Sequence, residues 1–268
     1  MTATIFTLKN ANFNNPNLPN ILPFVNQSNL DFAYDFKSRQ NRLNDLTGRH
    51  ADLVPIKVDK AANQVGMVDP TIISDLSGEG IKVTLGHLKT DIALAPIDLS
   101  QSFTVIVVGG NAGTIASDKV VGSAPDRANL IDFGTSISKV GGFCVDVAIG
   151  TKTIGARVLA ASHNISTSNA GTAFIALTYN AGIWTLYNKT AGKIVTKTNA
   201  QLGINSDILA VNTSAASHVV MGHFLGASTL AALPIALYQV ARWNTALTPE
   251  EIDKQYQFSK SGIKSISI

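Results

Sequence analysis

The side chains in this sequence that could catalyse the hydrolysis of sugars are pairs of carboxylates. The chain holds three glutamates, Glu79, Glu250 and Glu251, and the last two are adjacent. Retaining glycoside hydrolysis needs two carboxyl groups about 5 Å apart across the scissile bond. Two adjacent glutamates that follow a Thr-Pro pair and lie close to aromatic residues therefore raise the question of a glycosidase site.

The stretch "NTALTPEEID", residues 244–253, gives the two glutamates a structural role instead. Thr248 followed three residues later by Glu251 matches a capping box, in which each side chain accepts a hydrogen bond from the other residue's backbone amide. Pro249 suits the first helical position, where no donor is needed, and Glu250 lies at the positive end of the helix dipole. The pattern predicts a short C-terminal helix and no catalytic role for either glutamate.

The remaining carboxylates do not restore a catalytic pair. Glu79 lies in "SDLSGEG", a loop with glycines on both sides. Asp31 with Asp35, and Asp132 with Asp146, could replace glutamates in principle, but neither pair has a glutamate nearby in the sequence. The sequence therefore predicts a protein that is not an enzyme.

Metal ligands are equally sparse, and the sequence predicts no cofactor. Calcium prefers six to eight oxygens, usually from several carboxylates, so Asp75 and Glu79 with nearby backbone carbonyls are the calcium candidate, against an ordinary surface turn. His218 and His223 are five residues apart in an expected strand, so they point to opposite faces and cannot share a metal. We expect no structural zinc.

Aromatic side chains are the candidates for stacking against a sugar ring. Trp184 and Tyr187 lie in the stretch "IWTLYN", and Trp243 ends an apolar run near the C-terminus. Trp243 is expected in the core. Alternation in a strand puts Trp184 with Leu186 on one face and Tyr187 on the other, so Tyr187 is the residue expected to be exposed. Tyr187 and Trp184 are the predicted ligand-binding residues.

Composition limits the classes of function. Charged residues make up 15% of the 268 residues and the net charge is +3, with no clustered basic stripe, so binding to nucleic acid has no visible basis. Cys144 is the single cysteine, which excludes an intrachain disulfide. No run approaches the ~18 apolar residues of a membrane span, and the N-terminus lacks the pattern of a signal peptide, so we expect folding in a cytoplasm without membrane insertion.

Short strands dominate the chain. Residues 30–36, "LDFAYDF", alternate between apolar and polar positions, which predicts a strand with one face in a core and the other in water. Further strands are expected at 81–85, 102–108, 129–133, 143–149, 153–160, 172–179, 183–188, 193–197, 218–224 and 235–243. Many short strands with little helix indicate an all-β sandwich.

The first 29 residues differ from the rest. Residues 9–29 hold eight asparagines and three prolines without a period, which favours an extended arm over a packed element. The start, "TATIFTLK", alternates as a strand does. We expect residues 1–29 to be an arm for attachment or oligomerisation, with "ATIFTLK" adding a strand to a neighbour, and residues 30–268 to be the sandwich.

Four stretches carry a resemblance to a known family. The segment "ALYQVARWNTALTPEEIDKQY" resembles the end of laminin-G-like and concanavalin A-like lectin/glucanase domains, where a last strand runs into a Leu-Ser/Thr-Pro-Glu-Glu-Ile helix. "YDFKSRQNRLNDLTGRHADL" resembles the opening strand with its Asp-x-Ser/Thr-Gly turn, "QSFTVIVVGG" the central strand, and "IWTLYNKTAGKIV" the Trp-x-Leu-Tyr hairpin. Together they extend from about residue 30 to about residue 260.

The resemblance implies a jelly-roll sandwich of two antiparallel sheets, a fold shared by lectins, glycosidases, adhesion modules and virion proteins. The glucanase-type enzymes of the family carry a Glu-x-Asp-x-x-Glu or similar strand motif. Its legume-type lectins carry a dense cluster of carboxylates, asparagine and histidine for calcium and a transition metal. Neither is present here.

Three functions remain open at this point. We expect a non-enzymatic virion component, such as a bacteriophage tail-fibre, receptor-binding or decoration protein, made in the host cytoplasm. Its expected partners are other virion proteins, bound through the arm, and a cell-surface polysaccharide, and the protein is expected to form a homo-oligomer. The alternative is a bacterial carbohydrate-binding or adhesion module, and the third is a glycan hydrolase.

Overall fold

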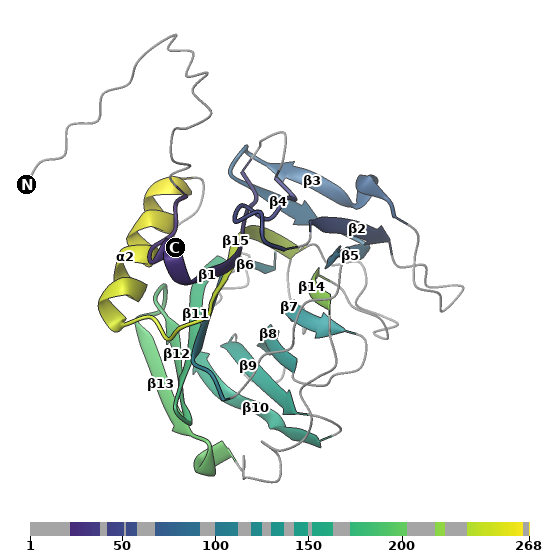
Figure 1. Ribbon diagram of the computed structural model, residues 1–268. Coiled ribbons are helices and arrows are strands. Elements are labelled where there is room, and N and C mark those ends of the chain that lie inside the picture. Colours follow the sequence, from purple (N-terminus) through teal and green to yellow (C-terminus); the bar gives the residue numbers. More distant parts are fainter. Residues whose placement is uncertain are drawn as a thin grey trace, which may run out of the picture.

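The computed structural model describes two antiparallel sheets and one α-helix, α2 (Pro249–Gly262) (Figure 1). These elements confirm the predicted all-β sandwich with a short C-terminal helix. The structure describes residues 22–37, 42–50, 52–57, 68–91, 100–111, 119–124, 130–136, 142–149, 152–162, 172–202, 218–222, 235–264 and 268, and between 119 and 162 it describes the backbone.

The first sheet has eight strands, and the last of the described strands pairs with three others. Seven strands follow the order β13-β12-β11-β6-β15-β4-β3, and β1 pairs with the end of β15 that β4 does not reach. Their bounds are β1 (Leu30–Asp35), β3 (Ile73–Leu76), β4 (Gly80–Val83), β6 (Phe103–Asn111), β11 (Thr172–Asn180), β12 (Ile183–Asn188), β13 (Lys193–Thr198) and β15 (Ile235–Trp243).

The second sheet has seven strands in the order β10-β9-β8-β7-β14-β5-β2. Their bounds are β2 (Leu53–Lys57), β5 (Gly86–Thr90), β7 (Lys119–Ala124), β8 (Leu130–Ser136), β9 (Gly142–Ile149), β10 (Lys152–Ser162) and β14 (His218–Gly222). The connections also contain three short 3-10 helices, η1 (Gln27–Asn29), η2 (Pro70–Ile72) and η3 (Ala200–Leu202).

Strands β2, β3, β5 and β7 were not expected from the sequence. Pro55 argues against a strand, but β2 lies at the end of the sheet order, where a proline is tolerated. Gly86 opens β5 because a Cβ there would lie 2.2 Å from the carbonyl oxygen of Ile56. Because proline and glycine are both unfavourable in strands, the sequence pattern does not predict β2 and β5.

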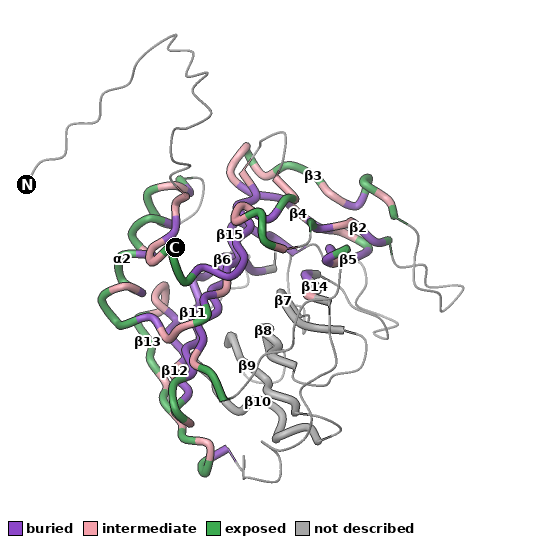
Figure 2. The backbone as a smooth tube through the Cα atoms, viewed as in Figure 1, coloured by how far each residue is buried: buried purple, intermediate pink, exposed green. Residues whose placement is uncertain are grey.

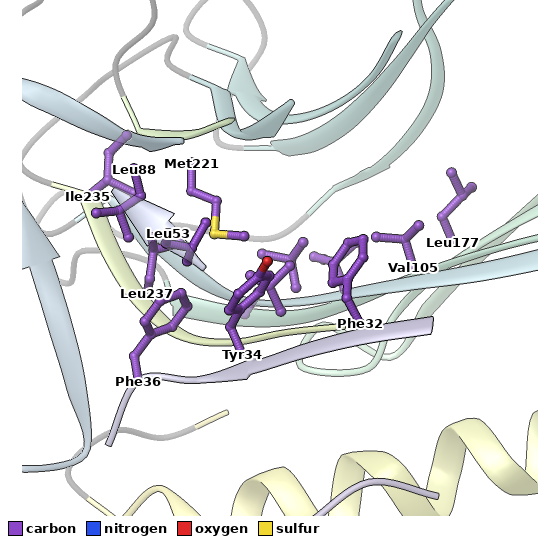
Figure 3. Packing of buried hydrophobic residues seen from close by; sticks show 14 of the residues in the cluster. Phe32, Tyr34, Phe36, Leu53, Leu88, Val105, Leu177, Met221, Ile235 and Leu237 are labelled. Atoms are coloured by element: carbon purple, nitrogen blue, oxygen red, sulfur yellow. The ribbon is translucent and has the colours of Figure 1, made fainter. Parts of the chain in front are cut away.

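The main core lies between the two sheets. Phe32 and Tyr34 of β1, and Phe36 directly after it, project toward the second sheet, on the side of the first sheet that faces away from α2 (Figure 3). There they meet side chains from the second sheet, among them Leu53, Leu88 and Met221 (Figure 3). This cluster buries apolar surface from both sheets, which favours their packing against each other.

A second core lies on the other face of the first sheet, beneath α2 (Figures 1 and 2). Its members come from the sheet, the helix and both ends of the described chain; they are Phe24, Leu30, Ala33, Ile106, Val108, Phe174, Ala176, Tyr187, Ala236, Tyr238, Ala241, Trp243, Leu247, Ile252, Ile263 and Ile268. The expectation that one face of residues 30–36 meets water is therefore wrong. Ala33 and Asp35 are buried because the helix covers them.

The start of α2 confirms the predicted capping box. The Thr248 hydroxyl accepts from the Glu251 amide at 3.2 Å, and Glu251 Oε2 accepts from the Thr248 amide at 2.9 Å. Pro249 occupies the first turn, with Glu250 beside it. Ile252 is fully buried, so the cap fixes a helix that covers the second core.

A Thr248→Ala variant is expected to be about 1 kcal/mol less stable, because one amide at the start of α2 loses its acceptor. Urea unfolding of both proteins measures the difference. Ser261→Ala, an exposed change near the other end of the helix, is the control and should change little. Equal stability of Thr248→Ala and wild type would contradict the role of the cap.

Residues 22–29, which the sequence assigns to the arm, are packed onto the sandwich. Phe24 is 2% exposed and meets Trp243 edge-on, with ring centroids 6.1 Å apart. The Trp243 indole donates to the Val25 carbonyl at 2.9 Å. Gln255 of α2 accepts from the Val25 amide and donates to the Pro23 carbonyl. This part of the arm belongs to the second core, while residues 1–21 lie outside the described residues.

Candidate functional site

The two predicted ligand-binding aromatics lie on opposite faces of β12, as alternation predicts. Trp184 is fully buried in the main core, where its ring lies 4.6 Å from that of Tyr179 and 5.9 Å from that of Phe103. Its indole N–H donates to Asn199 Oδ1 at 2.8 Å. Trp184 thus has a structural environment, and no part of its ring is presented to solvent.

Tyr187 lies on the outer face, yet the expectation that it is exposed is wrong. Its exposed fraction is 8%, because it belongs to the second core at the N-terminal end of α2. Burial raises the pKa of the phenol, and this outweighs the opposing effects of a hydrogen bond with the Thr178 side chain and of the Lys189 charge. The phenol is therefore protonated at neutral pH. Its ligand role stays a prediction.

Four threonines cross the outer face of the first sheet beside Tyr187. The strand registers place Thr104 of β6, Thr178 of β11, Thr185 of β12 and Thr196 of β13 in one row. The Thr104 hydroxyl donates to the Thr245 carbonyl and accepts from the Leu247 amide, so the segment that precedes α2 covers this end. Exposure then increases along the row toward Thr196.

The uncovered end of the row lies on a neutral surface, which we name the open face. Its residues share the outer side of β11, β12 and β13 beyond α2; they are Asn180, Ile183, Thr185, Ile194, Thr196 and Thr198. β13 lies at the margin of the molecule beside α2 (Figure 2). Ile183 is 48% exposed and Ile194 is 60% exposed. The open face therefore combines hydroxyl and amide groups with aliphatic surface, and none of these six residues is charged.

The calcium candidates both have other partners. Asp75 accepts from the Gly78 amide at 2.7 Å and forms an ion pair with Arg42 at 3.1 Å. Glu79 Oε2 accepts from the Lys264 amide at 2.9 Å. In the part of the chain that the structure describes, no three histidine, cysteine, aspartate or glutamate side chains gather as metal ligands. The calcium site stays a prediction.

A buried ionic cluster at the start of β1 was not expected from the sequence. The β1–β15 register shifts between Leu30 and Phe32, so Asp31 lies at a bulge. Its carboxylate accepts from Arg242 Nε and Nη2, and His50 Nε2 lies 2.8 Å from its Oδ1. The Arg242 guanidinium also lies over the Phe32 ring, 5.0 Å from its centroid. These bonds fix the bulge, and we assign the cluster a structural role.

The ionisation of Asp31 should make the free energy of unfolding depend on pH. Burial by itself would raise its pKa, but Arg242 and His50 hold the pKa below the ordinary value of 3.8. A carboxyl whose pKa is lower in the folded state stabilises the fold above its unfolded pKa, and this contribution disappears as the pH falls toward its folded pKa. We expect Asp31→Asn to be less stable than wild type near neutral pH, and the difference to shrink below about pH 4.

Urea unfolding across that pH range measures the effect, and Asp253→Asn provides the control. Asp253 also pairs with a cation, Lys189, but its side chain is 59% exposed. An exposed pair contributes little to stability, so this variant should follow wild type. A gap between Asp31→Asn and wild type that is constant with pH would contradict the ionic role of Asp31.

Asp45 organises the turn that the family resemblance singled out. Its carboxylate is buried and accepts from the backbone amides of Ala33, Thr47, Arg49 and His50 at 2.9 to 3.2 Å. Gly48 completes the "DLTG" turn with a φ of 64°, in the left-handed region. The turn thus ties the loop after β1 back to β1 itself.

The strand register brings together one aspartate pair that the sequence leaves apart. Asp132 of β8 and Asp146 of β9 are direct partners, although their side chains are outside the described structure. The register alone does not make this pair a site.

Comparison with known proteins supports the fold. No protein-family model and no curated protein matches the sequence. Domain 4 of AbnA, a GH43 extracellular arabinanase from Geobacillus stearothermophilus solved with arabinotriose, is 16% identical, with a TM-score of 0.58 over 84% of this chain and 97% of that domain.

Toxin domains are similar as well. The binding domain of Paraclostridial Mosquitocidal Protein 1 is 14% identical with a TM-score of 0.54, and that of botulinum neurotoxin serotype D is 12% identical with a TM-score of 0.58. This chain spans 52% of each of these two. At such low identity the similarity shows the fold, a β-sandwich of the kind used by binding domains and glycosidase-related domains.

Proposed function

We propose that this protein is a non-enzymatic binding module of a virion, such as a bacteriophage tail-fibre, receptor-binding or decoration protein, and that it binds a host surface glycan on its open face. The observation that carries the proposal is the open face itself. It is an uncharged sheet surface lined by Thr185, Thr196 and Thr198, with Tyr187 at its border.

The chemistry of the open face matches a neutral sugar. Hydroxyl and amide groups donate and accept hydrogen bonds with sugar hydroxyls, and Ile183 and Ile194 offer apolar surface to the C–H faces of a pyranose ring. Thr185 and Thr196 already lie with their hydroxyl oxygens 3.3 Å apart, so their positions are fixed before a ligand arrives. In this pair one hydroxyl donates to the other, and side chains that are already held in place lose little entropy when they bind a ligand.

The structural neighbours support a binding role without specifying its ligand. One of them holds arabinotriose, and others are the binding domains of protein toxins. A virion role rests on the neutral composition and on the arm that precedes the sandwich. The similarity to a domain of an arabinanase favours a second candidate, a carbohydrate-binding module of a bacterium.

The structural roles of the three glutamates support the proposal that the protein has no hydrolase activity. Glu250 and Glu251 begin α2, and Glu251 completes the capping box. Glu79 bonds the Lys264 amide at the end of a hairpin. Incubation with bacterial surface polysaccharides is expected to release no reducing sugar, and reproducible release would overturn the non-enzymatic assignment.

A glycan array on purified protein tests the proposed ligand. We expect binding to neutral glycans by wild type, and about tenfold weaker binding by Thr185→Val with Thr196→Val, since each lost hydrogen bond contributes about 0.5 to 1.5 kcal/mol. Valine has the shape of threonine, so the melting temperature should not change. Gln257→Ala, on the exposed side of α2, is the control that should bind as wild type does.

Two outcomes would overturn this proposal. Equal glycan binding by wild type and the double variant would show that the glycan binds outside the open face. If wild type binds no glycan, the proposed ligand is wrong. The genes beside this one distinguish the virion from the bacterial module, because capsid or tail genes are expected for the former alone.

A further inference from the structure

Two hydrogen bonds show which backbone groups of strand β13 point away from its partner β12. The sheet order of the described strands ends at β13, which pairs with β12. The Asn199 amide donates to the Gly182 carbonyl on the β12 side, and the Thr198 amide instead donates to Gln201 Oε1 on the far side. Backbone groups of successive residues in a strand point to alternate sides. Thr196 and Ile194, two and four residues before Thr198, therefore direct their N–H and C=O groups away from β12.

This edge is short and its ends are closed. Gln201 of η3 folds back onto Thr198, whose hydroxyl accepts from the Gln201 amide at 3.2 Å. At the other end a turn holds Gly192, whose amide donates to the Lys189 carbonyl. The site thus offers four backbone groups, those of Ile194 and Thr196, beside an isoleucine that is 60% exposed.

One register in which a second β13 could pair with this edge is unfavourable. In the antiparallel register that pairs Ile194 with Thr196 of another copy, Lys193 lies opposite Lys197, once on each side of the twofold axis. Like charges directly opposite each other destabilise paired strands. Lysines on an edge strand commonly prevent such self-pairing. The edge therefore suits a strand that carries no positive charge.

The sequence itself contains a segment with this composition. Residues 2–8, "TATIFTL", are uncharged and rich in β-branched and aromatic residues. Residues 9–21 join them to Leu22 and can span about 45 Å when extended. That connection starts on the α2 side of the first sheet, because Gln255 of α2 binds Pro23 and Val25. The segment can therefore reach a β13 edge on an adjacent molecule.

We propose that residues 2–8 of one copy add a strand to the β13 edge of a second copy, so that reciprocal exchange of arms forms a homo-oligomer. This inference specifies the partner of the arm in the proposed function, and it does not depend on glycan binding. Each contact is small, with four backbone hydrogen bonds, so reciprocity matters: closing the second contact is intramolecular and raises the overall affinity.

Sedimentation of the full chain tests the proposal. Wild type is expected as a dimer or larger closed oligomer of the 28.2 kDa chain. A variant that lacks residues 2–8 should sediment as a monomer with an unchanged melting temperature. A monomeric wild type, or an oligomer that survives the deletion, would overturn the proposal.

Two substitutions at one position distinguish strand addition from other causes of oligomerisation. Thr196→Pro removes the outward N–H while the β12 bonds remain, as proline does on an edge strand, and it should give monomers. Thr196→Val keeps the N–H and should remain oligomeric, although it loses a hydroxyl that the proposed glycan site uses. Should Thr196→Pro fail to fold, the deletion variant decides. Oligomeric folded Thr196→Pro would contradict the proposal.

Discussion

A protein that lacks residues 1–29 is expected to be at least about 3 kcal/mol less stable than wild type, whereas one that lacks residues 1–21 melts as wild type does. The difference lies in residues 22–29. Phe24 is buried against Trp243, and removal of a buried phenylalanine side chain alone costs about 3 to 5 kcal/mol. The deletion also removes the carbonyl that the Trp243 indole binds.

Thermal and urea unfolding of both truncated proteins measures this difference, and Phe24→Ala in the full chain is the matched single change. The whole loss of stability should come from the deletion of residues 22–29. If both truncations melt as wild type does, then residues 22–29 do not stabilise the sandwich. This expectation replaces the one that follows from sequence alone, in which the whole of residues 1–29 is dispensable for folding.

An Asp45→Ala variant is expected to lose about 3 kcal/mol of stability, because a single side chain satisfies four backbone amides in a buried turn. Buried amides without acceptors cost far more than the net value of the bonds they lose. Asp45→Asn retains one acceptor oxygen and should fall between wild type and Asp45→Ala.

Chemical denaturation measures these changes, and Asp253→Ala is the control, since that aspartate is exposed on α2. It is expected to lie within about 0.5 kcal/mol of wild type. An Asp45→Ala protein as stable as the control would show that water replaces the carboxylate, and the turn would then not need an aspartate.

Local chemistry explains which elements the sequence predicts well. The cap of α2 involves residues three apart, and the predicted bounds of β12 and β15 match those observed, because alternation and turn residues act over short distances. The resemblance to a known family predicts the "DLTG" turn, and the hydrogen bonds of Asp45 explain why its first residue is an aspartate.

Long-range pairing explains what the sequence does not show. Asp31 and Arg242 are separated by 211 residues, and nothing near either position indicates the other. Alternation assigns Tyr187 to the outer face correctly, but it does not say that α2 covers that part of the face. The row of threonines that leads to the open face spans four strands, so it becomes visible only when the strand registers are known.

The position of β15 has a consequence for the order of events during synthesis. This strand lies between β6 on one side and β1 with β4 on the other, so three strands pair with a strand that is synthesised after all of them. Pairings of such high sequence separation fold slowly. A ribosome must release the residues up to Trp243 before the first sheet can close, so the nascent protein exposes strand edges that chaperones would have to protect.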